Sequence, residues 1–211
     1  MNERKLIEQM IRDTEESIRY FSSPIKPERE VATCAAFLRC LGLNFNISDL
    51  GPVEQDPPDV QFKSASFEIK EYVDDDRRRH DEYKKLLSRL KKAKKLNDLI
   101  EPFSPPQPLT IKDVCNKLAQ FLGEYARMYG KSLCSSLDAL VYFNLMGYYV
   151  DNKNILADIS QLKAQCWRSV SIISNSVAYI FYASTDAPDF LRANVDRFRK
   201  EWTNSGLFDL T

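Results

Sequence analysis

Over the first 20 residues, apolar positions repeat every three or four residues, and the same repeat returns from Pro27 to Leu41. The segment Ser22-Ser23-Pro24 separates the two stretches, because proline and serine interrupt a continuous helix. Proline suits the first turn of the second helix, and Gly42 suits its end. The pattern therefore predicts an N-terminal helix followed by a helix over 27–41.

The pattern then changes to a period of two. Apolar and polar residues alternate in Asp59–Phe62 and Ser66–Val73, which predicts two short strands. Asn44–Ile47 is a candidate for a further short strand. Gly51–Pro58 contains three prolines and a glycine, so we expect a loop with no ladder of hydrogen bonds.

The remainder of the chain mixes both periods. Asp74–Leu99 is long, charged and helical in pattern, and the proline-rich Glu101–Pro108 is the best candidate for an internal boundary. Thr110 is expected to cap the next helix in a capping box with Asp113. The other expected elements are a buried strand over Asp138–Asn144, a hairpin of Trp167–Ile173 and Val177–Ala183 around Ser174-Asn175-Ser176, and a helix over Ala187–Trp202.

This order of elements predicts an α/β (α+β) fold with a central mixed β-sheet flanked by helices. We expect a single domain over 1–211, since its length suits one hydrophobic core. Within it, 1–26 would be a helical extension and 27–145 the core, interrupted by the connection at 101–108. Residues 146–211 would add a C-terminal β-hairpin and helix packed on that core.

Composition narrows the class of protein. Hydrophobic residues make up 44% and charged residues 28%, with a formal net charge of zero, which is ordinary for a globular protein. The five cysteines are odd in number and form no C-x-x-C pair, so neither a disulfide framework nor a zinc knuckle is indicated. The charged N-terminus lacks the apolar centre of a signal peptide, and we expect a cytoplasmic protein with no membrane segment.

Four D/E-x-K triplets occur in the chain, at Glu3, Glu68, Glu82 and Asp151. Only the triplet at Glu68 lies within an alternating strand that directly follows a Pro-Asp dipeptide, Pro58-Asp59. The others lie at the N-terminus, in a charged helical run and in a turn. Context therefore selects Asp59, Glu68 and Lys70.

A tight hairpin centred on Ser64-Ala65 would bring these residues together. It places Phe62 opposite Phe67 and Val60 opposite Ile69, so that these four apolar side chains share one face. The same register places Asp59 opposite Lys70, and Gln61 opposite Glu68, on the other face. Ser-Ala is a poor two-residue turn, so the prediction includes a longer loop that keeps the same register.

Two neighbouring carboxylates with a lysine form a coherent apparatus for phosphodiester hydrolysis. Mg²⁺, or Mn²⁺ in its place, prefers carboxylate oxygens and can activate a water and stabilise developing charge. Lys70 could position or deprotonate that water, or neutralise the transition state. Glu30 on the preceding helix is a candidate third metal ligand, with Glu28 as the competing choice; either could instead be ordinary acid in a first helical turn.

A basic run could contact nucleic-acid phosphates. Ten of the 30 Lys and Arg fall between Arg77 and Lys95, and the candidates are Arg77, Arg78, Arg79 and Lys84. The alternative is the solvated start of a helix. His80, the one histidine, is predicted to be structural.

These motifs resemble the PD-(D/E)XK nuclease superfamily: a helix bearing Glu30, then PPDV at 57–60 and FEIKE at 67–71. The resemblance implies a restriction-endonuclease-like core, Mg²⁺ bound by Asp59 and Glu68, and Lys70 assisting the attacking water. The whole chain is also similar to a small bacterial family, known mainly from pseudomonads, that is described only as candidate endonucleases. The segments that carry this second likeness are PPDVQF at 57–62, FEIKE at 67–71, RRRHDEY at 77–83, WRSVS at 167–171 and DAPDFLRANV at 186–195.

The resulting hypothesis is a metal-dependent endonuclease that hydrolyses nucleic acid, with DNA expected over RNA. A homodimer is compatible with double-strand cleavage. One alternative is a catalytically inactive nuclease fold that binds nucleic acid or protein, and another is an interaction protein on which the polar patch is incidental surface. Metal binding separates the first hypothesis from both alternatives.

Overall fold

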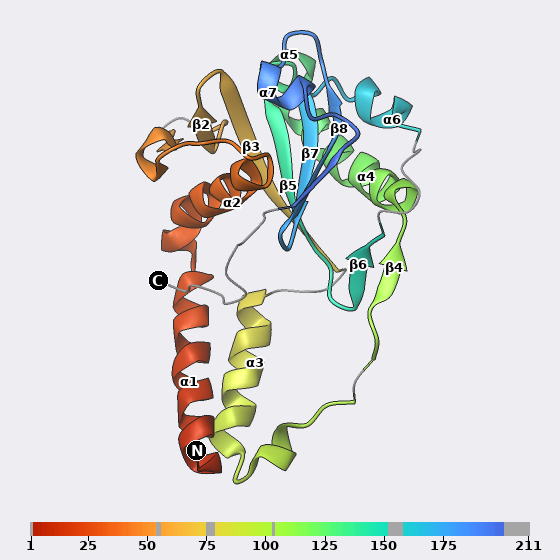
Figure 1. The fold of residues 1–211 in the computed structure, drawn as a ribbon. Coiled ribbons are helices and arrows are strands. Elements are labelled where there is room, and N and C mark those ends of the chain that lie inside the picture. The colour runs from red at the N-terminus through yellow and green to blue at the C-terminus, as the bar shows by residue number, and fades with distance from the viewer. Residues whose placement is uncertain (1, 54–55, 75–78, 103, 152–157, 201–211) are drawn as a thin grey trace.

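A computed structural model describes residues 2–53, 56–74, 79–102, 104–151 and 158–200 of the chain. Its centre is a seven-stranded sheet in the order β1-β2-β3-β5-β7-β8-β9, in which β3, β5 and β7 run parallel and the other neighbours antiparallel (Figure 1). The strands are β1 Gly51–Pro52, β2 Val60–Phe62, β3 Ala65–Val73, β5 Asp138–Asn144, β7 Ser169–Ser174, β8 Val177–Ala183 and β9 Phe198–Lys200. A separate parallel pair joins β4 Gln107–Leu109 to β6 Tyr148–Val150.

Helices cover both faces of the sheet, as expected of a mixed α/β fold. The α-helices of the described residues are α1 Glu3–Tyr20, α2 Lys26–Cys40, α3 Arg79–Lys92, α4 Ile111–Tyr129, α5 Lys131–Cys134, α6 Ser160–Ala164 and α7 Asp189–Arg192. The short 3₁₀ turns are Ser23–Ile25, Ile47–Asp49 and Leu96–Leu99. The predicted fold class is confirmed.

Two hydrophobic layers hold the helices to the sheet. On one face, α4 and α6 bury apolar side chains such as Leu118 and Leu162 against β5 and β7. On the other face, α2 and α7 pack Phe37 and Leu191 against β2, β3 and β8. Strand β5 alternates between the layers, with Val141 in the first and Leu140 in the second, so the strand is apolar on both sides.

A buried ion pair ties together the beginnings of the three parallel strands. The Asp138 carboxylate accepts hydrogen bonds from the Ser66 backbone N–H at 3.0 Å and the Ser169 hydroxyl at 2.8 Å. Arg168, directly before β7, pairs with the same carboxylate. The first residues of β3, β5 and β7 are therefore fixed relative to one another.

Helices α1 and α3 form an arm that extends away from the sheet (Figure 1). Phe21 at the end of α1 stacks on Tyr83 of α3, with ring centroids 5.3 Å apart. Farther out, Lys91 pairs with Glu15 at 2.9 Å. The two helices are thus joined both near the sheet and toward the outer end of the arm.

Several expected elements are confirmed. The first two helices, the strand over Asp138–Asn144 and the second strand of the C-terminal hairpin occur as predicted, within one or two residues. Thr110 caps α4: its hydroxyl accepts from the Asp113 N–H at 3.2 Å, and the Asp113 carboxylate accepts from the Thr110 N–H at 3.1 Å. All five cysteines are free thiols.

The predicted register of the β2–β3 hairpin is wrong by two residues. Val60 pairs with Phe67 and Phe62 with Ala65, because the turn lies at Lys63-Ser64 and Lys63 adopts a φ of 52°. Side chains alternate with a period of two, so a shift of two residues leaves every side chain on its predicted face. Continuing this register places Asp59 opposite Glu68 instead of Lys70.

Four other expectations also fail. Asn44–Ile47 forms no strand, whereas Gly51–Pro52 does pair with β2 despite its proline, which a short edge strand tolerates. Within the described part of Asp74–Leu99, the α-helix covers Arg79–Lys92 alone and a 3₁₀ turn follows. Within the described part of the predicted C-terminal helix, up to residue 200, only Asp189–Arg192 is helical, and Phe198–Lys200 instead pairs with β8 as an edge strand. No helix among the described residues is long and apolar enough to cross a membrane.

Candidate metal centre and active site

The site lies where β2 separates from β3 and leaves one edge of β3 open. Pro57 and Pro58 precede β2 and have no N–H to continue the ladder. The Asp59 carboxylate replaces the missing strand: its Oδ2 accepts a hydrogen bond from the Ile69 backbone N–H at 2.7 Å. The local sequence thus fixes Asp59 at the open edge of β3.

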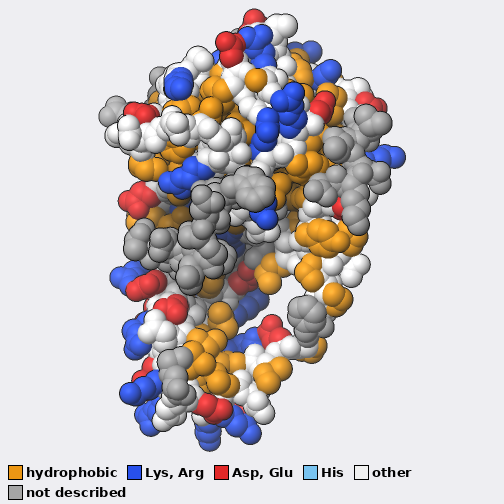
Figure 2. Space-filling model, viewed as in Figure 1, with side chains coloured by type: hydrophobic (Ala, Val, Ile, Leu, Met, Phe, Trp, Pro, Cys, Tyr) orange, Lys and Arg blue, Asp and Glu red, His pale blue; other side chains and the backbone are white. Residues whose placement is uncertain are grey.

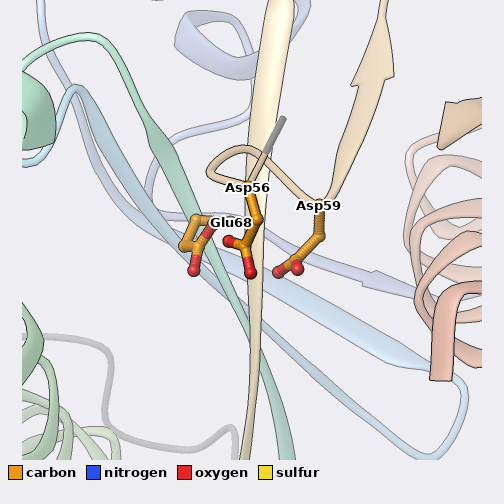
Figure 3. A group of neighbouring side chains, drawn as sticks. All are labelled: Asp56, Asp59 and Glu68. Atoms are coloured by element: carbon orange, nitrogen blue, oxygen red, sulfur yellow. The ribbon is translucent and has the colours of Figure 1, made fainter. Parts of the chain in front are cut away.

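Three carboxylates converge at this edge. One oxygen each of Asp56, Asp59 and Glu68 lies within 4.8 Å of the others, a spacing that a single metal ion could bridge. Figure 3 shows Asp56 and Asp59 descending from the segment before β2 toward Glu68. The Asp59 and Glu68 side chains are 4% and 0% exposed, whereas Asp56 is exposed and forms the open side of the group.

Two lysines lie among these carboxylates. The Lys70 ammonium pairs with Glu68 and lies 3.6 Å from Asp59 Oδ2. From α2, the Lys26 ammonium lies 3.0 Å from Glu30 and 3.5 Å from Asp59 Oδ1. Asp59 is therefore shared between a lysine of β3 and a lysine of α2, and Glu30 joins the site through Lys26.

Helix α4 closes the opposite side of the site. The Tyr129 hydroxyl donates a hydrogen bond to Glu68 Oε1 at 2.7 Å. One helical turn earlier, the Tyr125 ring faces the Lys70 ammonium at 5.4 Å from its centroid. The spacing of four residues puts both rings on one side of α4, above the Glu68–Lys70 pair.

Burial and crowding of like charges change the acidities of these groups. Burial raises the pKa of Glu68, and the charge of Asp59 adds to this effect against the opposing influence of Lys70 and Tyr129. Burial likewise raises the pKa of Glu30, to which Asp59 contributes and which Lys26 opposes. Burial alone would lower the pKa of Lys70, but the charges of Asp59 and Glu68 outweigh it and the pKa is raised. Burial is thus the main cause of the raised pKa of both glutamates, and the neighbouring Asp59 raises both further.

The donor set fits a divalent cation. Asp56, Asp59, Glu68 and Glu30 carry four formal negative charges, and Lys26 and Lys70 carry two positive charges, which leaves two to be balanced. Glu68 Oε2 is buried and has no hydrogen-bond partner among the described residues. A buried carboxylate oxygen without a partner is costly, and a metal ion would satisfy it. Oxygen-only ligands are those that Mg²⁺ and Mn²⁺ prefer.

The structure brings Asp59, Glu68 and Lys70 into one group and places Glu30 beside it. Glu28 lies exposed on α2. Asp56 was missed because Gly51–Pro58 was interpreted only as a connection, although Asp56 lies three residues before Asp59. Tyr125 and Tyr129 were also missed, since local sequence does not show which part of the sheet a distant helix covers.

The predicted phosphate contacts have different surroundings. Arg77 and Arg78 lie outside the described residues. The Arg79 guanidinium lies between the Phe21 and Tyr142 rings, 4.7 and 4.9 Å from their centroids, and pairs with Glu71 at 2.6 Å. Its contacts connect the arm to the sheet. Lys84 is exposed on α3.

Comparison with known proteins gives a family for this chain. Residues 2–203 match the family described as "Putative endonuclease, protein of unknown function (DUF1780)". The chain belongs to this family. The family description names an endonuclease but assigns no established activity.

A solved structure has a related fold. It is a protein of unknown function from Pseudomonas aeruginosa strain PAO1, described as belonging to the monooxygenase superfamily. The two chains are 26% identical, with a TM-score of 0.67, over 95% of this chain and 96% of the other. No curated protein is similar enough to this chain to match it.

Proposed function

We propose that this protein is a metal-dependent endonuclease of the PD-(D/E)XK type, which hydrolyses DNA phosphodiesters with Mg²⁺ or Mn²⁺. The observation that carries the proposal is the convergence of Asp56, Asp59 and Glu68 within 4.8 Å, next to Lys70. The family description supports an endonuclease, and the superfamily, metal and DNA substrate are the further steps proposed here.

Each side chain has a distinct role in this proposal. Asp56, Asp59 and Glu68 would hold the cation, and Glu30 would act through Lys26 and Asp59. The bound cation would supply an acidified water and a Lewis acid for the phosphodiester. Lys70, between Asp59 and Glu68, can donate a hydrogen bond to the attacking water or to a phosphoryl oxygen whose charge grows in the transition state.

The description of the Pseudomonas aeruginosa structure names the monooxygenase superfamily. The donor set of this chain favours hydrolysis over one such chemistry, that of the non-haem iron oxygenases. Non-haem iron oxygenases commonly bind iron through two histidines and one carboxylate. This chain contains a single histidine, His80, which lies on α3 and not in the carboxylate group.

The test is calorimetric titration of Mg²⁺ and Mn²⁺, with cleavage of plasmid and single-stranded DNA followed in parallel. Asp59→Asn keeps an oxygen that can accept from the Ile69 N–H but removes the charge, so metal binding should weaken about tenfold or more. Lys70→Met should retain metal binding and lose about a hundredfold of the cleavage rate.

Glu124→Gln is a matched control, because Glu124 is an exposed carboxylate on α4 outside the site. It should bind metal and cleave like the wild type. If the wild type neither binds these metals nor cleaves, the enzyme proposal is rejected, and a binding module with a nuclease fold replaces it.

A further inference from the structure

A cleft of about 530 Å³ adjoins the carboxylate group, between α2 and the sheet. Lys26, Glu30 and Lys70 line it; Lys26 contacts Asp59, Lys70 contacts Glu68, and Glu30 pairs with Lys26. The cleft, hereafter the α2 cleft, therefore opens directly onto the proposed reaction centre.

The floor of the α2 cleft is formed at the carboxyl ends of the parallel strands. Glu71, Tyr142 and Ile173 of β3, β5 and β7 line it. Ligands of α/β proteins bind preferentially at this edge of a sheet. On the opposite wall, α2 presents the small residues Ala32, Thr33 and Ala36, so the helix leaves space where larger side chains would fill it.

The lining changes character along the cleft. At the metal end, Lys26 and Lys70 supply positive charge that suits a phosphate. Ile173 and Ala36 add apolar walls that suit the faces of a base, and they lie beside the Tyr142 ring, which the Arg79 guanidinium contacts. Tyr20, which is 44% exposed, and Asn175 also line the cleft, where a ring and an amide can meet a base or sugar.

We propose that the α2 cleft binds one unpaired nucleotide of the strand that is cut, with its phosphate toward Lys26 and Lys70. This inference rests on the proposed function and names its substrate class: single-stranded or locally unpaired nucleic acid. The cleft volume falls in the range of sites for single small ligands. A base in a duplex would have to unpair and leave its stack before it could enter the cleft, which costs free energy. An unpaired strand avoids this cost.

The test measures binding separately from cleavage. Fluorescence anisotropy in EDTA compares a fluorescein-labelled octathymidylate with a blunt DNA duplex of the same length, and an octauridylate asks whether RNA is accepted. Wild type should bind at least one single strand about tenfold more tightly than the duplex. Equal or tighter binding of the blunt duplex would overturn the proposal.

Ala32→Trp fills the α2 cleft from an exposed position, so the core packing is unchanged. It should weaken single-strand binding about tenfold or more. Ala32→Ser keeps the cleft open, and Gln120→Trp adds the same bulk at an exposed position on α4 outside the cleft; both should bind like the wild type. Unchanged binding by Ala32→Trp would reject the site.

Cleavage by the same variants separates the two proposals. If the wild type cleaves, but Ala32→Trp cleaves single strands equally well, the cleft is not the substrate site while the nuclease proposal stands. If no variant cleaves, but the binding order above holds, the catalytic proposal fails while the cleft remains a site for unpaired strands.

Discussion

Tyr129 acts on the metal site through Glu68. Its hydroxyl donates to Glu68 Oε1 and leaves Oε2 as the free oxygen, so the hydrogen bond orients the carboxylate. Tyr129→Phe removes only this hydroxyl. We expect Mg²⁺ and Mn²⁺ affinity to fall about tenfold, in the range measured for such outer hydrogen bonds. Calorimetric titration gives the affinity.

Tyr125→Phe serves as the matched control, because it removes a hydroxyl from the same face of α4 but keeps the ring that faces Lys70. Its metal affinity should equal that of the wild type. Thermal unfolding of both variants distinguishes a site effect from a loss of stability. Wild-type metal affinity in Tyr129→Phe would show that Glu68 is oriented by the strand alone.

At the scale of elements, α4 depends on its capping box to carry Tyr125 and Tyr129 to the site. The Thr110 hydroxyl accepts a hydrogen bond from the Asp113 N–H and donates one to the Asp113 carboxylate at 2.6 Å. Thr110→Ala should cost about 1 kcal/mol of stability. For a chain of this length the melting temperature should fall by about 2–4 °C, measured by calorimetry or circular dichroism.

The same capping box has a defined pH dependence. Hydrogen bonds from the Thr110 side chain and backbone lower the pKa of Asp113 from its ordinary value of 3.8. The stability that this carboxylate adds is therefore present above pH 3.8 and is lost as the pH falls through the lowered pKa. Thr110→Ser should melt like the wild type, and a Thr110→Ala variant equally stable at neutral pH would contradict the role of the cap.

The β2–β3 hairpin shows what the sequence could and could not predict. Because side chains alternate along a strand, Asp59, Glu68 and Lys70 stay on one face when the pairing of the two strands shifts by two residues. The grouping of these residues was therefore predictable, although the exact pairing was not. The turn at Lys63-Ser64 lacks the Asn-Gly type of signal that specifies a two-residue hairpin.

Contributions from outside the hairpin were harder to predict. Asp56 reaches Asp59 and Glu68 by the path of its loop, which has no periodic pattern. Helix α4 lies between the parallel strands β3 and β5, so a crossover helix over this face could be expected. Which of its turns lies above Glu68, however, depends on packing across the whole layer.

At the scale of the whole molecule, a zero net charge is combined with a strongly basic helix. Between Arg79 and Lys95 the chain carries eight Lys and Arg and two acidic residues. Figure 2 shows Lys and Arg side chains gathered at the outer end of the arm. The arm extends from the sheet close to the α2 cleft, since Tyr20 and Arg79 line that cleft. A bound strand that leaves the cleft toward this side would meet α3.

Lys84, exposed on α3, is therefore expected to contact a phosphate of the bound strand. Lys84→Ala should weaken binding of every sequence alike and reduce the slope of log K against log salt concentration by about one. Anisotropy titrations of the octathymidylate at several salt concentrations give this slope.

Lys112→Ala removes an equal charge from an exposed position at the start of α4 and should keep the wild-type slope. This pair of lysines separates a local phosphate contact from the general effect of net charge, because both variants change the net charge by the same amount. If both variants lower the slope equally, the effect comes from the change in net charge, and Lys84 makes no local phosphate contact. If Lys84→Ala alone lowers the slope, a phosphate of the bound strand contacts α3 at Lys84.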